Sequence, residues 1–269
     1  MIPIKSTFCI FYQKDHDDRE RNLNILLHYL LKNYTDLEIL VLQQYIDKEQ
    51  RDNLKPLPIF RNENIFHHRL LEDTEYWNKM TAYNFGLKYA SYDTIFFNDV
   101  DTIFNPQDIV KAYDLINNEN KILIPSGPNF IDVKVPLIEK FKETLDYNTY
   151  LNEYQNFHVY ENNLFRRNNM GGPGGGLAGN KNTFISMNGF NPKFKGWGFE
   201  DDETRERFAK FGNPVKFIDD GDPIFHMVHE GAKRGTAMCK YMETNRQVLE
   251  EMRAMSYEQV KEYSFSWKL

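Results

Sequence analysis

The sequence predicts an α/β fold built on a parallel sheet, and three features of the chain lead to this prediction. Residues 8–13 and 37–43 are short apolar runs of the kind found in buried strands. Between them, leucines recur at spacings of three and four over residues 19–32, which indicates an amphipathic helix. A helix between two strands is the crossover of a βαβ unit, and such units form parallel sheets. Ligands bind beyond the carboxyl ends of the strands in sheets of this kind.

The composition excludes several classes of protein. The chain has 269 residues, of which 41% are hydrophobic and 15% aromatic, enough for one large α/β domain or two small ones. A net charge of −6 and the lack of a basic run argue against binding to nucleic acid or to an anionic membrane surface. No run approaches ~18 apolar residues, so we expect no transmembrane segment. With two cysteines, Cys9 and Cys239, and no signal-peptide pattern, we expect a cytoplasmic protein.

The remaining elements are expected to continue the alternation of strands and helices. In order, we predict a helix over 78–90, a strand ending at Asp99, a helix over 106–117 after the Asn105-Pro106 cap, a strand over 122–124, a helix turn over 182–187, a helix from 200 to about 211, a strand over 215–218 and a helix over 238–254. Residues 44–76 are polar and broken by Pro56 and Pro58, so we expect irregular structure there. Residues 125–170 are expected to form loops and short helices over the sheet.

The strand over residues 94–97 ends abruptly in Asp99-Val100-Asp101. Carboxylates at the exit of a buried strand are costly to desolvate unless a cation lies beside them. Oxygen ligands there suit a divalent ion such as Mg²⁺ or Mn²⁺, which would in turn hold a diphosphate. By itself the tripeptide is common, and an ordinary strand-end turn with solvated aspartates is then the simpler explanation.

Residues 171–179 hold six glycines in nine positions, a composition that cannot form a stable helix or strand interior. The run is either a flexible loop or a backbone that closely approaches a ligand or another strand. A P-loop is excluded because no Lys-Ser or Lys-Thr pair follows the glycines.

Four consecutive acids, Glu200 to Glu203, follow Gly196-Trp197-Gly198 at a predicted helix start. Acidic residues in a first turn are favoured by the helix dipole, so capping is one explanation. Four adjacent carboxylates exceed what capping needs and repel one another, which favours a general base aimed at a sugar hydroxyl.

Two histidines, His226 and His229, stand three residues apart near the end of a predicted strand. On a regular strand they would point to opposite faces and could not share one ion. Either the segment is bulged or turned, or only one of the two is a ligand. The basic loop that follows, with Lys233 and Arg234 between glycines, suits a mobile cover over phosphates.

Five motifs follow one another along residues 8–235: Asp99-Val100-Asp101, the glycine run 171–176, Asn188-Gly189-Phe190, Gly196-Trp197-Gly198-x-Glu200-Asp201-Asp202 and His226-x-x-His229. In this order they resemble the β-1,4-galactosyltransferase family and its bacterial relatives, which include the transferase domains of chondroitin polymerases. The resemblance implies a single GT-A (nucleotide-diphospho-sugar transferase) domain over 1–269, with a Rossmann-like mixed central sheet flanked by helices. The nucleotide would bind in the half over 1–125, and the acceptor in the half over 126–269.

The resemblance also implies a role for individual residues. It implies Mn²⁺, with Mg²⁺ as the alternative, bound by Asp101 and His229, with His226 as a further candidate ligand. It implies a catalytic base at Asp201 and acceptor or donor-sugar contacts from Glu200, Asp202, Trp197 and Gly172. The nucleotide contacts that it implies are those of Tyr12, Gln13, Arg19, Arg21, Trp77, Lys79, Asp99 and Val100. The implied reaction moves galactose or N-acetylgalactosamine from a UDP-sugar to a hydroxyl of a saccharide acceptor in one inverting displacement.

Some positions depart from the family pattern. His226 stands where the family often has methionine, and because imidazole is a harder ligand than a thioether, tolerance of Mg²⁺ could widen. Asn168-Asn169-Met170 replaces aromatics near the donor sugar, which leaves the choice between the two sugars open. The usual Pro-Phe-Arg of the uridine-contacting turn is absent. The membrane stem and the cysteines of the animal enzymes are missing, which favours a bacterial or viral version.

Three other functions compete with this one. A GT-A transferase could use another donor, such as UDP-glucose or UDP-glucuronate. A catalytically inactive nucleotide-sugar-binding protein would not need Asp101, Asp201 and His229 together. A nucleotidyltransferase could use Asp-x-Asp for its metal, but it leaves residues 197–202 unexplained.

Overall fold

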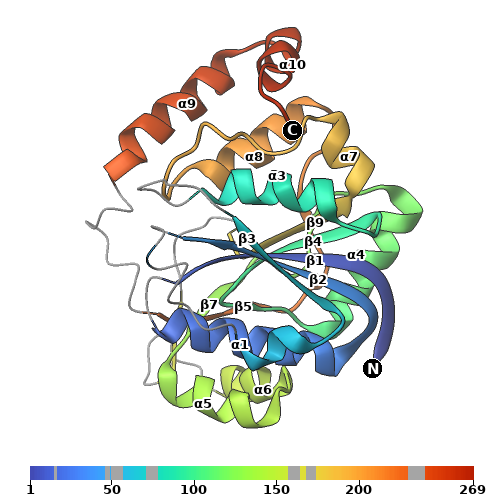
Figure 1. The fold of residues 1–269 in the computed structure, drawn as a ribbon, viewed down its shortest axis with the longest axis vertical. Coiled ribbons are helices and arrows are strands. Elements are labelled where there is room, and N and C mark those ends of the chain that lie inside the picture. Colours follow the sequence, from blue (N-terminus) through green and yellow to red (C-terminus); the bar gives the residue numbers. More distant parts are fainter. Residues whose placement is uncertain are drawn as a thin grey trace.

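The computed structural model describes residues 1–14, 17–45, 49, 57–70, 78–156, 164–167, 174–229 and 240–269. Over these residues the strands form two sheets (Figure 1). The larger one has seven strands in the spatial order β10 (Lys216–Phe217), β6 (Leu123–Ile124), β9 (Gly176–Asn180), β4 (Thr94–Asp99), β1 (Ile2–Gln13), β2 (Tyr34–Gln44) and β3 (Ile65–Leu70). The smaller one has four, in the order β5 (Thr102–Ile103), β11 (Ile224–Met227), β7 (Phe130–Val133) and β8 (Phe165–Arg167).

The larger sheet is mixed, as the fold prediction expected. β1 runs parallel to both β2 and β4, β2 runs parallel to β3, and β6 runs parallel to β10. β9 lies between β4 and β6 and is antiparallel to both. The parallel pair β1 and β2 is joined by α1 (Asp17–Asn33), which is the βαβ opening predicted from the leucine spacing. The carboxyl ends of β1 and β4 therefore meet at one edge of the sheet.

Helices cover both faces of this sheet (Figure 1). One face carries α1, α4 (Pro106–Glu119), α5 (Val135–Thr144) and α6 (Asn148–Asn156), and the other carries α3 (Lys79–Tyr89), α7 (Lys181–Ser186) and α8 (Glu200–Lys210). The alternation of side chains along β1 supplies both cores: Phe8 and Ile10 pack with the first set of helices, and Cys9 and Phe11 with the second. A short 3₁₀ helix, η1 (Pro58–Arg61), precedes β3.

Two helices beyond α8 complete the chain. α9 (Met242–Ala254) and α10 (Tyr257–Ser264) share a small core of their own around Leu249, Met252 and Val260. Partly buried residues of the α8 region, Phe199 and Phe211, also pack against it. No helix within the described ranges combines the length and the apolar character needed to cross a membrane.

Asparagine side chains cap two of the helix starts, and the cap at Asn105 is the one that was predicted. The side chain of Asn78 accepts a hydrogen bond from the Thr81 amide and begins α3, so that Lys79 occupies its first turn. The side chain of Asn105 accepts from the Gln107 amide, and Pro106 fills the first position of α4, where its missing N–H costs nothing.

The prediction that the glycine run cannot enter a strand was wrong for residues 176–180. These residues form β9, in the middle of the larger sheet. A Cβ on Gly176 would lie 2.6 Å from Phe104 Cζ, and one on Gly179 would lie 2.9 Å from Phe184 Cζ. The second alternative for the run, a close approach of its backbone to neighbouring structure, therefore holds here. Residues 171–173 lie outside the described part of the chain.

Two further stretches hold strands where none was expected. β3 lies within the polar stretch 44–76 and pairs in parallel with β2. Because β3 is an edge strand, Ile65 is buried while Phe66 is exposed, and the stretch shows little apolar character overall. In 125–170 the predicted short helices are present as α5 and α6, but β7 and β8 belong to the smaller sheet.

Candidate active site

The two aspartates at the end of β4 serve two different clusters. Asp99 is the last residue of β4, and its Oδ1 accepts a hydrogen bond from Tyr83 Oη at 3.1 Å while its Oδ2 accepts from the Gly175 amide at 3.2 Å. Asp101 lies in the turn between β4 and β5, is buried, and faces two histidines. Val100 between them is buried in the hydrophobic core, so any ligand contact from it would have to use its backbone.

The first cluster is Asp101, His226 and His229. Asp101 Oδ1 lies 3.7 Å from His226 Nε2, and Asp101 Oδ2 lies 3.1 Å from His229 Nε2. One ligand atom from each of the three residues lies within 4.8 Å of the others. Although burial alone would raise the pKa of the Asp101 carboxyl, the two imidazoles hold it well below its usual range. Burial alone would lower the pKa of His226, but Asp101 and Asp132 raise it to about 10.

The chain turn after β11 brings both histidines to this cluster. His226 lies on β11, which ends at Met227, and His229 follows after the strand has ended. The alternative in which the segment is turned therefore holds. Helix α1 anchors the segment: Asn22 Nδ2 donates to the Met227 carbonyl at 2.9 Å, and Arg21 Nη2 donates to the Val228 carbonyl at 3.1 Å.

This cluster fits a divalent cation. It offers a carboxylate and two imidazoles, a donor set that suits Mn²⁺ and its first-row neighbours. Among the described residues, the buried Nδ1 of His229 has no hydrogen-bond partner. His226 Nδ1 lies 2.9 Å from Asp132 Oδ1, and when Nδ1 donates to this carboxylate, Nε2 is left as the ligating nitrogen.

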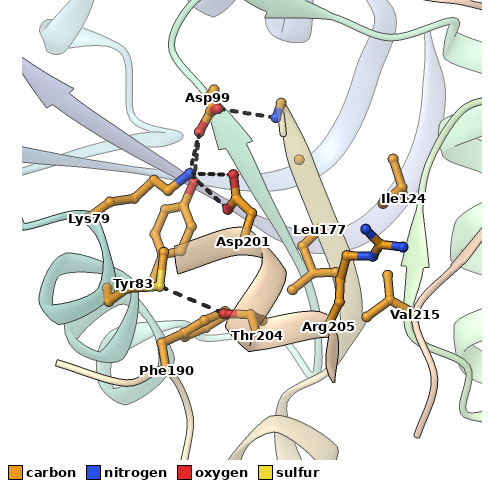
Figure 2. A pocket seen from close by; sticks show the side chains of 13 residues that line it. Lys79, Tyr83, Asp99, Ile124, Leu177, Phe190, Asp201, Thr204, Arg205 and Val215 are labelled. Atoms are coloured by element: carbon orange, nitrogen blue, oxygen red, sulfur yellow. Dashed lines mark hydrogen bonds and ion pairs between the residues drawn. The ribbon is translucent and has the colours of Figure 1, made fainter. Parts of the chain in front are cut away.

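The second cluster is centred on Lys79 in the first turn of α3 (Figure 2). Its buried ammonium lies 3.0 Å from Asp201 Oδ1, 3.7 Å from Asp99 Oδ1 and 3.8 Å from Glu200 Oε1. Burial alone would lower the pKa of Lys79, but Asp201 and Asp99 raise it well above its usual value. Lys79 is therefore a cation held among three carboxylates.

The turn before α8 places Asp201 in this cluster. Gly196 and Gly198 have φ of 63° and 115°, and Phe199 has φ of 67°, so three of the four residues before the helix are left-handed. The Glu200 carboxylate accepts a hydrogen bond from the Gly198 amide at 2.7 Å and closes the turn. Because α8 begins at Glu200, Asp201 points from its first turn toward Lys79 (Figure 2).

The four acids at this helix start have four different environments. Glu200 is buried, and burial together with the charge of Asp201 raises its pKa to about 7. Burial also raises the pKa of Asp201, and Lys79 opposes that rise. Asp202 is 43% exposed. Glu203 is fully buried and bonds Arg207 Nε at 2.8 Å. Only part of the acidic run is thus available for chemistry.

A pocket joins the second cluster to the surface of the neighbouring strands (Figure 2). Its lining residues come from α3, α8, the ends of β4, β9 and β6, and the loops beside them: Lys79, Met80, Tyr83, Asp99, Ile124, Gly175, Gly176, Leu177, Phe190, Asp201, Thr204, Arg205 and Val215.

The residues expected around the nucleotide and the sugars lie in several different parts of the structure. Tyr12 and Gln13 are buried at the carboxyl end of β1. Arg19 Nη2 lies 3.4 Å from His229 Nε2, so this arginine and Arg21 both contact the histidine segment. Trp197 is half-buried against the core on the α3 and α8 face. Two predicted residues, Trp77 and Gly172, lie outside the described residues, as do residues 168–170 and the basic loop 231–237.

Several residues of these clusters were missed by sequence reasoning. Asp132 on β7 orients His226. Asp99 accepts hydrogen bonds from Tyr83 and from the Gly175 amide. Asn22 donates a hydrogen bond to the Met227 carbonyl. Asp132 carries a signal, since it is a lone acid in the apolar run Phe-Ile-Asp-Val, where a buried charge requires a partner. Tyr83 and Asn22 lie within ordinary helical patterns and give none.

Comparison with known proteins identifies the family. The family described as glycosyl transferase family 2 matches residues 10–185, and that described as the N-terminal domain of galactosyltransferase matches residues 156–230. The catalytic domain of Drosophila β1,4-galactosyltransferase 7 in complex with xylobiose matches with a TM-score of 0.49 at 18% identity, over 91% of this chain and 80% of that one. A mutant of the Drosophila enzyme in complex with manganese, UDP-Gal and xylobiose matches with a TM-score of 0.48 at 18% identity. This match covers 90% of this chain and 80% of that one. The sequence matches no curated protein.

The family 2 match covers more than half of the chain, and the galactosyltransferase match covers the segment that holds Asp201 and both histidines. The expected resemblance, the GT-A fold and the enzyme class are confirmed. The chain belongs to glycosyl transferase family 2 and is a glycosyltransferase, and its residues 156–230 match a galactosyltransferase domain.

Proposed function

We propose that the protein is an inverting, metal-dependent transferase that moves galactose or N-acetylgalactosamine from a UDP-sugar to a hydroxyl of a saccharide acceptor. The observation that carries the proposal is the pairing of two clusters at the end of β4. Asp99 belongs to the cluster with Lys79 and Asp201, and Asp101 two residues later belongs to the cluster with the histidines. The match to a galactosyltransferase domain over 156–230 supports the choice of sugar.

In this proposal Asp101, His226 and His229 hold Mn²⁺, with Mg²⁺ as the alternative ion. When bound, the ion supplies positive charge that stabilises the departing diphosphate. Asp132 and Asn22 keep the ligands in place through their bonds to His226 and to the Met227 carbonyl. The nucleotide side of the site is formed by Tyr12, Gln13, Arg19, Arg21, Trp77, Lys79, Asp99 and Val100. One domain that spans the chain holds both sides of the site.

Asp201 acts as the general base. It takes the proton of the acceptor hydroxyl, and the oxygen of that hydroxyl attacks the anomeric carbon from the face opposite the leaving UDP. The bond to UDP breaks as the new glycosidic bond forms, so the anomeric configuration inverts. Lys79 bonds both oxygens of Asp201, at 3.0 and 3.4 Å, and so favours its ionised form. Glu200, Asp202, Trp197 and Gly172 complete the sugar-binding side.

The first test is release of UDP from UDP-galactose, UDP-N-acetylgalactosamine, UDP-glucose and UDP-glucuronate. Each is measured with a panel of saccharide acceptors in Mn²⁺, in Mg²⁺ and in EDTA. We expect turnover of UDP-galactose or UDP-N-acetylgalactosamine that EDTA abolishes and Mn²⁺ restores. The product linkage, read by NMR, is expected to show inversion at the anomeric carbon.

Each other result has a definite meaning. Turnover of UDP-glucose or UDP-glucuronate alone would correct the donor and leave the mechanism standing. Binding of UDP without turnover of any donor would indicate an inactive nucleotide-sugar-binding protein. Retention of configuration, or full activity in EDTA, would contradict the mechanism.

A further inference from the structure

Arg205 lies one helical turn after Asp201 and lines the same pocket (Figure 2). Residues four apart on a helix share a face and are displaced by about 6 Å along its axis. In Figure 2, Asp201 and Arg205 stand on opposite sides of Leu177. α8 therefore presents a carboxylate and a cation to one pocket.

The charge of Arg205 is only weakly compensated. Among the described residues, the one carboxylate within ion-pair distance is that of Asp202, at 4.0 Å, and both side chains of this pair are about 40% exposed. Arg207 on the same helix provides the contrast: it is fully buried and bonds Glu203 and the carbonyls of Met187 and Gly189. Arg207 holds the fold together, whereas Arg205 keeps most of its donors available.

The surroundings of Arg205 in the pocket are apolar. Ile124, Leu177 and Val215 line the end at which it lies. The Arg205 side chain is 40% exposed, so an incoming anion can reach its guanidinium from solvent along these apolar walls. Its planar fork of donors matches the two oxygens of a carboxylate or a phosphate. The apolar side chains offer a surface for the C–H face of a pyranose ring.

The position of Arg205 points to the acceptor and not to the nucleotide. The pocket runs from Asp99 at the end of β4, past β9, to Ile124 at the end of β6. In the sheet order this direction leads away from β1. The histidine cluster is instead held by α1, which follows β1 along the chain.

We propose that the acceptor saccharide carries an acidic group, a carboxylate or a phosphate, and that Arg205 binds it. The inference rests on the proposed function, because it takes Asp201 as the base that receives the acceptor hydroxyl. With the hydroxyl at Asp201 and the acidic group at Arg205, the acceptor ring lies across Leu177. Arg205 also offsets the repulsion that Asp201 exerts on an anionic acceptor.

The test compares acidic and neutral probes on the full chain with Mn²⁺ and the donor that turns over. The probes are methyl β-glucuronide, methyl β-glucoside and glucose 6-phosphate. Their binding to the UDP-loaded enzyme is followed by saturation-transfer NMR, and transfer is followed by UDP release. The variants are Arg205→Gln and Arg205→Lys, with Arg246→Gln as control, since Arg246 is an exposed arginine paired with Glu243 on α9.

We expect at least one acidic probe to bind more tightly than the glucoside. Arg205→Gln should weaken its binding about tenfold or more, the size of one charged hydrogen-bonded contact. Arg205→Lys should retain part of the affinity, because it keeps the charge and loses the fork. The KM for the donor and the binding of the glucoside should stay within about twofold in every variant. A preference for glucuronide or for glucose 6-phosphate identifies the acidic group.

Three results would overturn the inference. The first is equal binding of acidic and neutral probes, or no binding of either acidic probe to UDP-loaded enzyme. The second is an unchanged acidic preference in Arg205→Gln. The third is a raised KM for the UDP-sugar, which would assign Arg205 to the donor. Failure of the proposed function looks different, since UDP itself would then not bind or no donor would turn over.

Discussion

Lys79 joins three acidic side chains that lie far apart in the sequence. Asp99 comes from β4, and Glu200 and Asp201 come from the start of α8. Burial raises the pKa of Asp201 and of Glu200, and the buried ammonium of Lys79 opposes both rises. The lysine thereby sets the protonation of the proposed base.

The role of Lys79 predicts a large effect of Lys79→Met on stability. Removing one partner of a buried ion pair leaves the other charges uncompensated, at a cost of about 3 kcal/mol or more. The loss in the free energy of unfolding should be smaller at low pH, where the carboxyls take up protons, and denaturant unfolding at two pH values measures it. Lys88→Met on the exposed side of α3 is the matched control. Equal stability of Lys79→Met and wild type at both pH values would contradict this account.

The pKa of Glu200, about 7, predicts the pH dependence of catalysis. Below that pH the Glu200 and Asp201 pair retains one proton, so the fraction of Asp201 that is ionised and able to accept the acceptor proton falls. The rate, kcat/KM, should therefore rise with pH along an acid limb with an apparent pKa near 7. Glu200→Gln removes a neighbouring negative charge and should move this limb to lower pH. A limb displaced upward in Glu200→Gln would show that the charge of Glu200 does not act on the base.

The same pair has an opposite effect on stability. Because its pKa is raised on folding, its contribution to stability is fully present below the ordinary glutamate value of 4.5 and is lost as the pH rises through 7. The site is thus expected to be most active at pH values at which this pair no longer stabilises the fold.

A substitution of Asp132 tests the metal cluster and leaves all three proposed ligands intact. It accepts from His226 Nδ1 at 2.9 Å, and such partners typically change metal affinity by about 10- to 100-fold. Asp132→Asn should weaken Mn²⁺ binding by that factor, as measured by calorimetric titration of the protein alone. Asp114→Asn, an exposed change on α4, should not alter it. Unchanged Mn²⁺ affinity in Asp132→Asn would remove Asp132 from the account of this cluster.

At the scale of elements, β9 links the sheet to the site. It runs antiparallel between β4 and β6, and the residues before it place the Gly175 amide on Asp99. Glycine lets this strand pass close to Phe104 and Phe184, which fill the space that side chains would otherwise occupy. In the second half of the run, residues 176–179, glycine at positions 176 and 179 is therefore required by packing.

This packing predicts the effect of Gly176→Ala. The added Cβ would lie 2.6 Å from Phe104 Cζ and 3.1 Å from the Phe97 carbonyl oxygen. Overpacking of this kind costs about 1–3 kcal/mol, so the free energy of unfolding should fall by that amount. In a Phe104→Leu background the end of the ring is absent and the additional cost should be smaller, as a double-mutant cycle measures. The same cost in both backgrounds would mean that Phe104 is not the obstacle.

Elements with strong periodicity or clear caps could be predicted from the sequence. α1, α3 and α4 follow apolar spacing and Asn caps, and β4 follows its apolar run. β3, β7 and β8 could not, because edge strands and short strands of a small sheet bury too few side chains to show alternation. No strand was predicted at β9, because its glycine-rich composition disfavours a strand. The reason for glycine there is its fit against Phe104 and Phe184, and these contacts between distant residues cannot be predicted from composition.

At the scale of the whole molecule, the site is assembled from segments that the fold brings to one edge of the sheet. The resemblance of residues 99–101, 196–203 and 226–229 to a family pattern makes them candidates for the chemistry. The sequence could not predict their division into two clusters. The bond between Lys79 and Asp201 spans 122 positions, and Arg19 contacts His229 across 210, distances over which no local pattern carries information.

The central claim is that Asp201 is the base of a glycosyl transfer, and Asp201→Asn tests it most directly. The measurement compares kcat for UDP release, at saturating donor and acceptor in Mn²⁺, with the affinity for UDP in the same samples. A general base contributes typically ~10²- to 10⁴-fold, so we predict a fall of at least ~100-fold in kcat with UDP affinity unchanged. Asp114→Asn, an exposed change on α4 outside the pocket lining, is the control. Turnover of Asp201→Asn within a few-fold of wild type would contradict the account.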